Sequence, residues 1–146
     1  MKDYNEILKE IAIEIEPLRH IGKQADYIPA LAKVNPDRFG MCITSTDGIV
    51  TEYGDMEERF SIQSVTKVFS LSMSLSLKGE QLWTRVSKEP SGAAFNSLIQ
   101  LELDRGIPKN PFINAGAIVL ADVLMSELES PLEEYLAFVR AISNDP

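Results

Sequence analysis

FSIQSVTKVF, residues Phe60 to Phe69, is the stretch on which both the fold and the chemistry of this sequence depend. It places Ser64 three residues before Lys67. In a helix two such side chains are surface neighbours, whereas in a strand residues three apart point to opposite faces. A joint role for Ser64 and Lys67 therefore requires a helix.

The residues that follow argue against that helix. Residues 69–77 read FSLSMSLSL, a strict alternation that by itself indicates a half-buried strand. A helix remains compatible with the pattern if it is central and mostly buried, because small serines allow close packing on all sides. Gly79 also stands where a C-terminal helix cap belongs. We therefore expect a buried helix that begins at Ser64.

Upstream of this segment the sequence predicts a helix and a hairpin. Residues 3–15 carry an apolar stripe at helical spacing, and Pro17 ends the pattern. The stripe consists of Ile7, Leu8, Ile11 and Ile15. Residues 39–46 and 49–53 are extended runs on either side of a Thr46-Asp47-Gly48 turn, a pattern typical of a β-hairpin.

Downstream, the sequence predicts three helices. The first covers residues 93–102, with Phe95, Leu98 and Ile99 facing inward. Asn114 could cap the second, whose apolar stripe consists of Ile118, Ala121, Leu124, Met125 and Leu128. Ser130, Pro131 and Glu133 supply a cap, a first-turn proline and a capping box for the third. Its stripe consists of Tyr135, Phe138, Val139 and Ile142. The expected fold class is α/β, of the α+β kind.

Composition restricts the setting in which the protein works. A chain of 146 residues with 45% hydrophobic and 25% charged side chains has the makeup of one soluble globular domain. Its formal charge of -8 repels phosphate backbones and anionic membranes, so we expect neither nucleic acid nor a membrane as partner. Cys42 is the single cysteine, and the opening MKDYNEILKE has no signal-peptide pattern, so we expect a cytoplasmic protein. Cys42 itself is expected to be a small core residue of its strand.

Serine and lysine at this spacing can perform acyl transfer from an amide. Such a reaction needs a nucleophile, a base to take its proton and donors for the oxyanion. Ser64 and Lys67 could supply the first two, and the unpaired backbone N–H of a serine at a helix N-terminus could supply one donor. Burial would favour the neutral, basic form of the lysine. However, roughly one S-x-x-K is expected by chance in a chain with this many serines and lysines, so the motif alone indicates only an ordinary solvated lysine.

Four ordered blocks carry a more specific signal. They read QADYIPALAKVNPDRFG (24–40), FSIQSVTKVF (60–69), KEPSGAAFNS (88–97) and NPFINAGAI (110–118). Together they resemble the serine-dependent glutaminases of the serine β-lactamase and penicillin-binding-protein superfamily. The resemblance implies a β-lactamase/transpeptidase-like fold, of which residues 1–146 form the N-terminal part of a glutaminase domain: an opening helix, a β-hairpin, the buried S-x-x-K helix and a mostly helical segment.

The resemblance also implies roles for individual residues. Ser64 matches the serine that attacks the side-chain amide of L-glutamine, Lys67 matches the lysine that activates it, and the backbone N–H of Ser64 matches half of the oxyanion hole. Asn114 and Tyr27 match substrate-contacting residues, although by spacing alone Asn114 is a helix cap and Tyr27 an ordinary loop aromatic. The family forms homo-oligomers and needs no cofactor, and no metal-ligand cluster stands out in the sequence. His20 is not expected to be catalytic.

Glutaminases of this kind are longer, and other residues of their site follow the position at which this sequence stops. The 146 residues could thus be a fragment, a truncated paralogue or a piece completed by another chain. We expect residues 1–146 alone to have little activity. Two other functions remain open: a different serine/lysine amide hydrolase of the same superfamily, and a non-catalytic module that pairs with a full-length chain.

Overall fold

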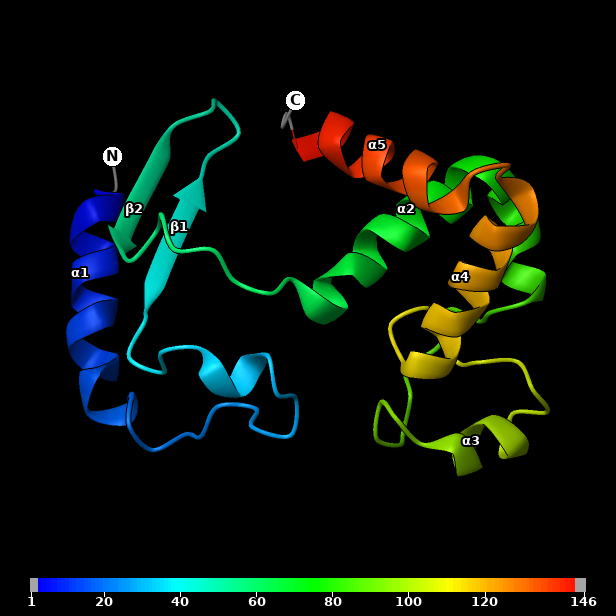
Figure 1. Cartoon of the computed structure of the whole chain (residues 1–146), viewed down its shortest axis with the longest axis horizontal. Coiled ribbons are helices and arrows are strands. Elements are labelled where there is room, and N and C mark those ends of the chain that lie inside the picture. Colours follow the sequence, from blue (N-terminus) through cyan, green and yellow to red (C-terminus); the bar gives the residue numbers. More distant parts are fainter. Residues whose placement is uncertain (1–2, 144–146) are drawn as a thin grey trace. The chain divides into compact units, whose positions relative to one another are not determined.

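The computed structural model describes residues 3–143, which divide into an N-terminal unit that ends at Ser61 and a C-terminal unit that starts at Ile62 (Figure 1). The N-terminal unit holds one long helix and a two-stranded sheet, and the C-terminal unit is helical. This combination confirms the expected α+β class, with the predicted order of helix, hairpin, S-x-x-K helix and helical segment.

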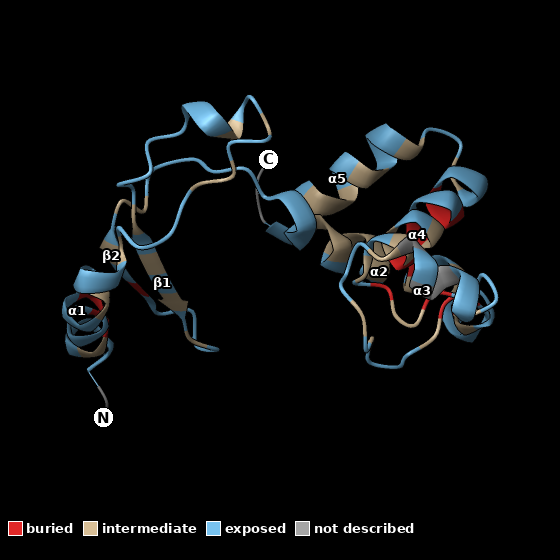
Figure 2. Cartoon of the chain, turned by 90° about the horizontal axis from the view of Figure 1, so that it is seen from below, coloured by how far each residue is buried: buried red, intermediate tan, exposed pale blue. Residues whose placement is uncertain are grey.

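The N-terminal unit is built by packing α1 (Tyr4–Ile15) against the hairpin. Asp3 caps the helix, and its carboxylate accepts the backbone N–H of Asn5 at 2.9 Å. The helix contacts β2, and its buried residues are Leu8 and Ala12, one turn apart (Figure 2). Of the predicted stripe only Leu8 is fully buried, because the small Ala12 lies at the contact in place of Ile11. Two short 3₁₀ turns follow α1, η1 (Glu16–Leu18) and η2 (Leu31–Lys33).

The predicted hairpin is confirmed. Strands β1 (Gly40–Thr44) and β2 (Val50–Gly54) pair antiparallel, with Cys42 opposite Glu52. Gly48, with φ of 84°, turns the chain, which explains why a glycine stands there. The expectation for Cys42 was wrong, since its side chain is exposed. Side chains alternate along a strand, and Cys42 shares the exposed face of β1 with Thr44, whereas Met41 and Ile43 face the other way.

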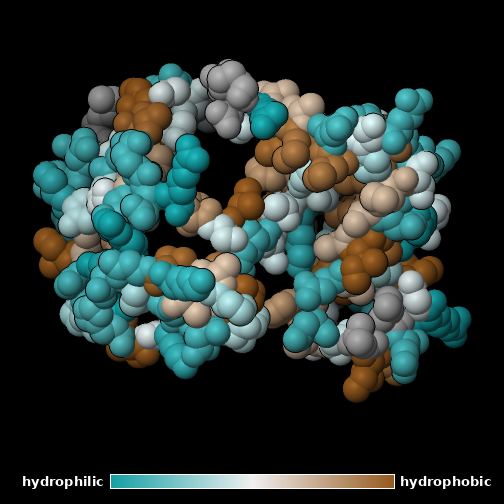
Figure 3. Space-filling model, viewed as in Figure 1, coloured by the Kyte–Doolittle hydropathy of each residue, from teal (hydrophilic) through white to brown (hydrophobic). Residues whose placement is uncertain are grey.

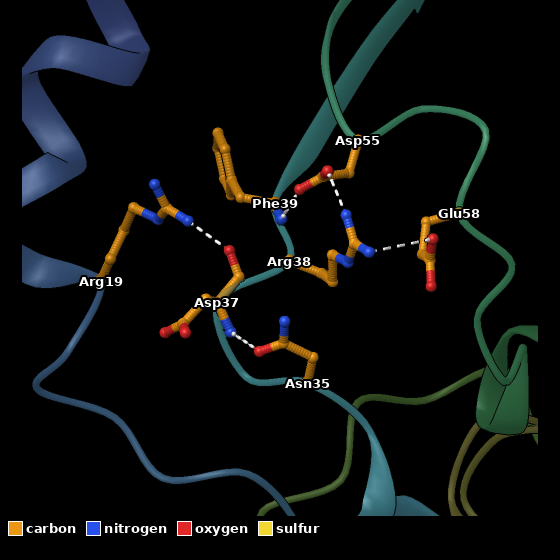
Figure 4. Close-up of polar contacts among 7 residues, drawn as sticks. All are labelled: Arg19, Asn35, Asp37, Arg38, Phe39, Asp55 and Glu58. Atoms are coloured by element: carbon orange, nitrogen blue, oxygen red, sulfur yellow. Dashed lines mark hydrogen bonds and ion pairs between the residues drawn. The ribbon is translucent and has the colours of Figure 1, made fainter.

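A group of polar contacts fastens the start of β1 to the turn after β2 (Figure 4). The carboxylate of Asp55 accepts the backbone N–H of Phe39 at 3.0 Å and the guanidinium of Arg38 at 2.8 Å. These two bonds, the first above all, lower the pKa of Asp55, and the same contact with Asp55 raises the pKa of Arg38. Beside them, the side-chain oxygen of Asn35 accepts the backbone N–H of Asp37 at 3.0 Å.

The C-terminal unit surrounds a small apolar core. Its elements are η3 (Gln63–Val65), α2 (Thr66–Lys78), η4 (Gly79–Thr84), α3 (Leu98–Leu103), α4 (Asn114–Glu127) and α5 (Pro131–Ser143). The core cluster consists of Leu82, Val86, Leu120 and Val123. It joins η4 to α4, and α4 also packs along α2, so the helix that carries Lys67 is held by the core.

Helix α2 forms despite the alternating sequence. Its serines are compatible with a helix because their hydroxyls bond to the preceding turn: Ser70 donates to the carbonyl of Thr66 at 3.1 Å and Ser72 to that of Val68 at 2.9 Å. Gly79, with φ of 53°, caps the helix as predicted. Two expected details differ, since the regular α-helix starts after a 3₁₀ turn that contains Ser64, and only Met73 and Ser74 of α2 are buried.

The predicted inward face of α4 was mostly wrong. Of that stripe only Leu124 is buried, whereas Ile118 and Met125 are 67% and 68% exposed. The helix instead buries Gly116, Leu120, Val123 and Leu124. Its sequence is apolar on nearly every side, so periodicity could not single out one face. Figure 3 shows hydrophobic residues, in brown, remaining at the surface of the C-terminal unit.

The flanking helices differ from prediction in detail. Helix α3 begins five residues later than expected, and Phe95 and Ile99 are exposed rather than inward. In α5, the backbone N–H of Ser130 is bound by Glu134 at 2.9 Å rather than by Glu133. Glu134 lies one full turn beyond Ser130, and that turn also closes through the backbone. Of its predicted stripe, Ile142 is exposed and the other three residues are half-buried.

Candidate active site

Ser64 lies exposed in the 3₁₀ turn that leads into α2. Among residues 3–143 neither its hydroxyl nor its backbone N–H has a hydrogen-bond partner. The preceding residue, Gln63, has φ of 42°, a conformation that costs energy for any residue with a side chain. A strained backbone therefore presents an exposed hydroxyl and an open N–H at the start of a helix.

Lys67 follows in the first turn of α2 and is half-buried. Its Nζ donates to the backbone carbonyl of Phe112 at 2.8 Å and to Oδ1 of Asn114 at 2.8 Å. The ring centroid of Phe95 lies 6.0 Å from the same nitrogen. Within the described chain Lys67 is thus bonded to the start of α4, and no bond between its Nζ and the Ser64 hydroxyl is present.

Asn114 is the first residue of α4 and does not cap it. Its backbone N–H donates to the carbonyl of Phe95 at 2.8 Å, and its side-chain oxygen accepts a hydrogen bond from Lys67. The cap interpretation of Asn114 was therefore wrong. The expected contact of Asn114 with the substrate stays a prediction, and its side-chain amide lies beside Lys67.

The side chain of Asn110 binds the backbone of the two residues just before α4. Its Oδ1 accepts the backbone N–H groups of Phe112 at 3.0 Å and of Ile113 at 3.2 Å. Sequence reasoning missed this residue. The signal was present, because an asparagine before a proline starts turns, and its side chain bonds the backbone two residues on.

Gly116 lets the start of α4 approach the loop that carries Asn110. A Cβ at this position would lie 2.0 Å from the backbone oxygen of Asn110 and 2.9 Å from Cα of Pro111. No side chain fits in that space, so the glycine is required for this close contact.

A short backbone ladder fastens the same loop to the segment before α3. The N–H of Ser87 donates to the carbonyl of Pro108 at 2.8 Å, and that of Glu89 to the carbonyl of Lys109 at 2.8 Å. The Lys109 ammonium also lies 2.9 Å from the Glu89 carboxylate, and this contact raises the pKa of Lys109. Residues 87–89 are thereby joined to residues 108–109, which lead into the loop before α4.

The other residues considered from the sequence belong to the N-terminal unit. Tyr27 belongs to the N-terminal unit, where it is 80% exposed, so its place at a substrate pocket stays a prediction. His20 also belongs to that unit, 3.9 Å from the carboxylate of Asp37. Residues 3–143 contain no group of three potential metal ligands, and none of their helices is both long and apolar enough to cross a bilayer.

Comparison with known proteins identifies relatives over nearly the whole chain. The family model described as Glutaminase matches residues 22–146. A glutaminase from Vibrio parahaemolyticus is 54% identical over 146 residues, which is 99% of this chain and 48% of that protein. A glutaminase from Pseudoalteromonas translucida is 52% identical over 143 residues, 98% of this chain and 47% of that protein. The chain thus spans about half the length of the curated relatives it matches.

Solved structures agree. A probable glutaminase, ybaS, superimposes with a TM-score of 0.81 at 31% identity, over 95% of this chain and 46% of that one. A probable glutaminase from Bacillus subtilis, complexed with 6-diazo-5-oxo-L-norleucine, gives a TM-score of 0.74 at 31% identity, over 97% of this chain and 41% of that one.

Proposed function

This chain belongs to the glutaminase family, and from that premise we propose that the protein hydrolyses L-glutamine to L-glutamate and ammonia, with Ser64 as nucleophile and Lys67 as its base. One observation carries the proposal: the Lys67 amine, one helical turn after Ser64, is held by two oxygen acceptors at 2.8 Å each. Both acceptors lie in the NPFINAGAI block.

Two acceptors suit a lysine that works as a base. A neutral amine has two N–H donors and one lone pair, whereas an ammonium has three donors and no lone pair. If the two donors of neutral Lys67 bind Phe112 and Asn114, the lone pair is left to receive the proton of Ser64. The arrangement supports the activating role assigned to Lys67.

The reaction then proceeds in two stages. The hydroxyl oxygen of Ser64 attacks the side-chain amide carbon of glutamine as Lys67 takes its proton, and the backbone N–H of Ser64 donates to the oxyanion. Lys67 returns the proton to the leaving nitrogen, so ammonia departs and a glutamyl ester remains on Ser64. Water hydrolyses that ester and releases glutamate, which restores the serine.

Asn114 and Tyr27 complete the proposal on the substrate side. Oδ1 of Asn114 is bound by Lys67, and its Nδ2 has no acceptor among residues 3–143, so its two donors can bind an oxygen of glutamine. The role of Tyr27 rests on the family motif alone. A polar amide beside the base suits a substrate with charged ends.

We also propose that residues 1–146 are the N-terminal part of the glutaminase domain, in a cytoplasmic homo-oligomer without a cofactor. Their match to about half of each relative supports the first point. A single cysteine is compatible with a reducing compartment, and the net charge of -8 makes nucleic acid and anionic membranes unsuitable partners. Homo-oligomer formation rests on the family resemblance.

Ammonia release from glutamine and from asparagine tests the proposal, measured on residues 1–146 and on the natural product of the gene. We expect activity in the natural product, little in residues 1–146, and loss of activity in Ser64→Ala. Lys67→Arg should lower the rate of ammonia release at least about 100-fold, because a guanidinium cannot act as a base. Ser72→Ala, which removes an exposed hydroxyl bonded within α2, is the matched control and should retain activity. Full activity in Ser64→Ala would refute the proposal.

A further inference from the structure

We propose that Asn110 is a positioning residue: it holds the Phe112–Ile113 peptide group in the orientation that receives the Lys67 amine. The inference rests on the proposed role of Lys67. The residue that would orient the acceptor of Lys67 is thus one whose own side-chain hydrogen bonds go to the backbone of Glu89, Phe112 and Ile113.

One peptide group links Asn110 to Lys67. The carbonyl of Phe112 and the N–H of Ile113 belong to the same planar unit and point in opposite directions. Its N–H donates to Oδ1 of Asn110 at 3.2 Å, and its carbonyl accepts from Nζ of Lys67 at 2.8 Å. Rotation of this plane would break both bonds, so the Asn110 amide determines where the lysine finds its acceptor.

The bond to Asn110 also changes the strength of that acceptor. A peptide whose N–H is hydrogen-bonded carries a more polarised carbonyl, so bonds in series strengthen one another. A second bond, from the N–H of Phe112 to the same Oδ1 at 3.0 Å, keeps the Asn110 oxygen in place. The chain of contacts thus runs from Asn110 through one peptide to Lys67.

Asn110 is itself anchored on two sides. Its Nδ2 donates to the carbonyl of Glu89 at 2.9 Å, beside the ladder that joins residues 87–89 to 108–109. Its backbone oxygen lies against Gly116, in the space that a Cβ would fill. Both polar ends of the amide and the backbone oxygen of Asn110 are therefore held.

A purely structural role for Asn110 is the competing explanation, since the bonds also satisfy the N–H groups of Phe112 and Ile113, which precede α4. The chain offers a matched control for it. Asn35 forms the same kind of turn, with its Oδ1 accepting the N–H of Asp37 at 3.0 Å (Figure 4), and this turn belongs to the N-terminal unit, whereas Lys67 belongs to the C-terminal unit. Removing either side chain should lower stability, and only removal of Asn110 should disturb Lys67.

The test compares Asn110→Ala with Asn35→Ala in the natural gene product. We expect both to lower Tm, and Asn110→Ala alone to lower kcat about 10- to 100-fold with KM changed less than about twofold, because misplacing a reacting group by about 1 Å costs that much. Asn110→Gln keeps the amide but displaces it by one methylene, so it should fold and still lose more than about fivefold in kcat. Equal kcat values for the Asn110 and Asn35 variants would overturn the inference.

A second readout needs no turnover and separates this inference from the proposed function. The ¹⁵N resonance of the Lys67 amine should shift in Asn110→Ala and Asn110→Gln and stay in place in Asn35→Ala. If the Lys67 resonance shifts as expected in the Asn110 variants but the protein releases no ammonia from glutamine, the proposed function is refuted and the positioning role of Asn110 stands. An unmoved resonance in the Asn110 variants would refute the positioning role, whatever the substrate.

Discussion

Nζ of Lys67 lies 2.8 Å from Oδ1 of Asn114, 47 residues further along the chain. The bond connects the first turn of α2 to the first turn of α4, two helices that pack along each other. Since Asn114 is neutral, it can bind the lysine amine in either charge state. A charged partner at this position would favour the ammonium.

Asn114→Asp should therefore slow the reaction at neutral pH and move its pH dependence. The carboxylate would keep the hydrogen bond but favour the protonated, non-basic lysine. We expect kcat at pH 7 to fall at least about 10-fold and to recover toward higher pH. The measurement is a pH–rate profile of ammonia release, with Asn35→Asp as control. A profile that falls uniformly, without moving along the pH axis, would contradict this account of Asn114.

Gly116→Ala should destabilise the protein by more than about 2 kcal/mol, because its Cβ would overlap the Asn110 backbone, which cannot yield as a flexible side chain would. Gly92→Ala is the matched control in the same unit, since a Cβ there would meet nothing within 4 Å. It should be neutral or slightly stabilising. Urea denaturation of the two variants compares them, and equal midpoints would show that the close approach at Gly116 is absent in solution.

Leu120→Ala and Ile118→Ala test which face of α4 is buried. Leu120 is fully buried in the core, so its truncation should cost about 2–5 kcal/mol of unfolding free energy. Ile118 is 67% exposed, and its truncation should cost less than about 0.5 kcal/mol. Urea denaturation of the two variants measures both losses of unfolding free energy. A larger loss at Ile118 would favour the face that the sequence pattern predicted.

Asp55→Ala should lower stability in a pH-dependent way. The pKa of Asp55 is depressed in the folded protein by the Phe39 N–H and by Arg38. Its stabilising contribution is therefore complete above the unfolded value of about 3.9 and is lost as the pH falls through the lower folded value. Urea midpoints of the wild type and Asp55→Ala should differ at pH 7 and converge well below pH 4. Glu57→Ala, an exposed neighbour, is the control, and a difference that persists at low pH would exclude the titration of Asp55 as its cause.

The sequence predicted the order of the elements better than their contacts. Local signals were sufficient for the cap at Gly79 and for the turn at Gly48. For α2, we predicted a helix against the alternating pattern because Ser64 and Lys67 had to share a face. The structure has that helix, and its serine hydroxyls donate hydrogen bonds to carbonyls of the preceding turn. That outcome depends on side-chain bonds that a hydrophobic pattern does not represent.

The site was predicted only in part, for a physical reason. The family resemblance identified Ser64, Lys67 and Asn114 as site candidates, but the bond between Lys67 and Asn114 depends on how two helices pack. The roles of Asn110 and Gly116 lie in backbone contacts, which leave no mark on polarity or periodicity. The sequence of α4 is apolar on nearly every side and indicated no preferred face, which explains the error there.

The acceptor that Phe112 offers to Lys67 is a backbone carbonyl, and this has a consequence for how the NPFINAGAI block can vary. Any residue except proline at 112 or 113 supplies the same backbone N–H and carbonyl groups, so a library randomised at these two positions should keep many functional members. The same library at 110 or 116 should keep few, since one position needs an amide and the other needs the absence of a side chain. Positions in this block would then tolerate mutation when their side chains play no part in orienting the Phe112–Ile113 peptide group. How close each side chain lies to Ser64 would matter less.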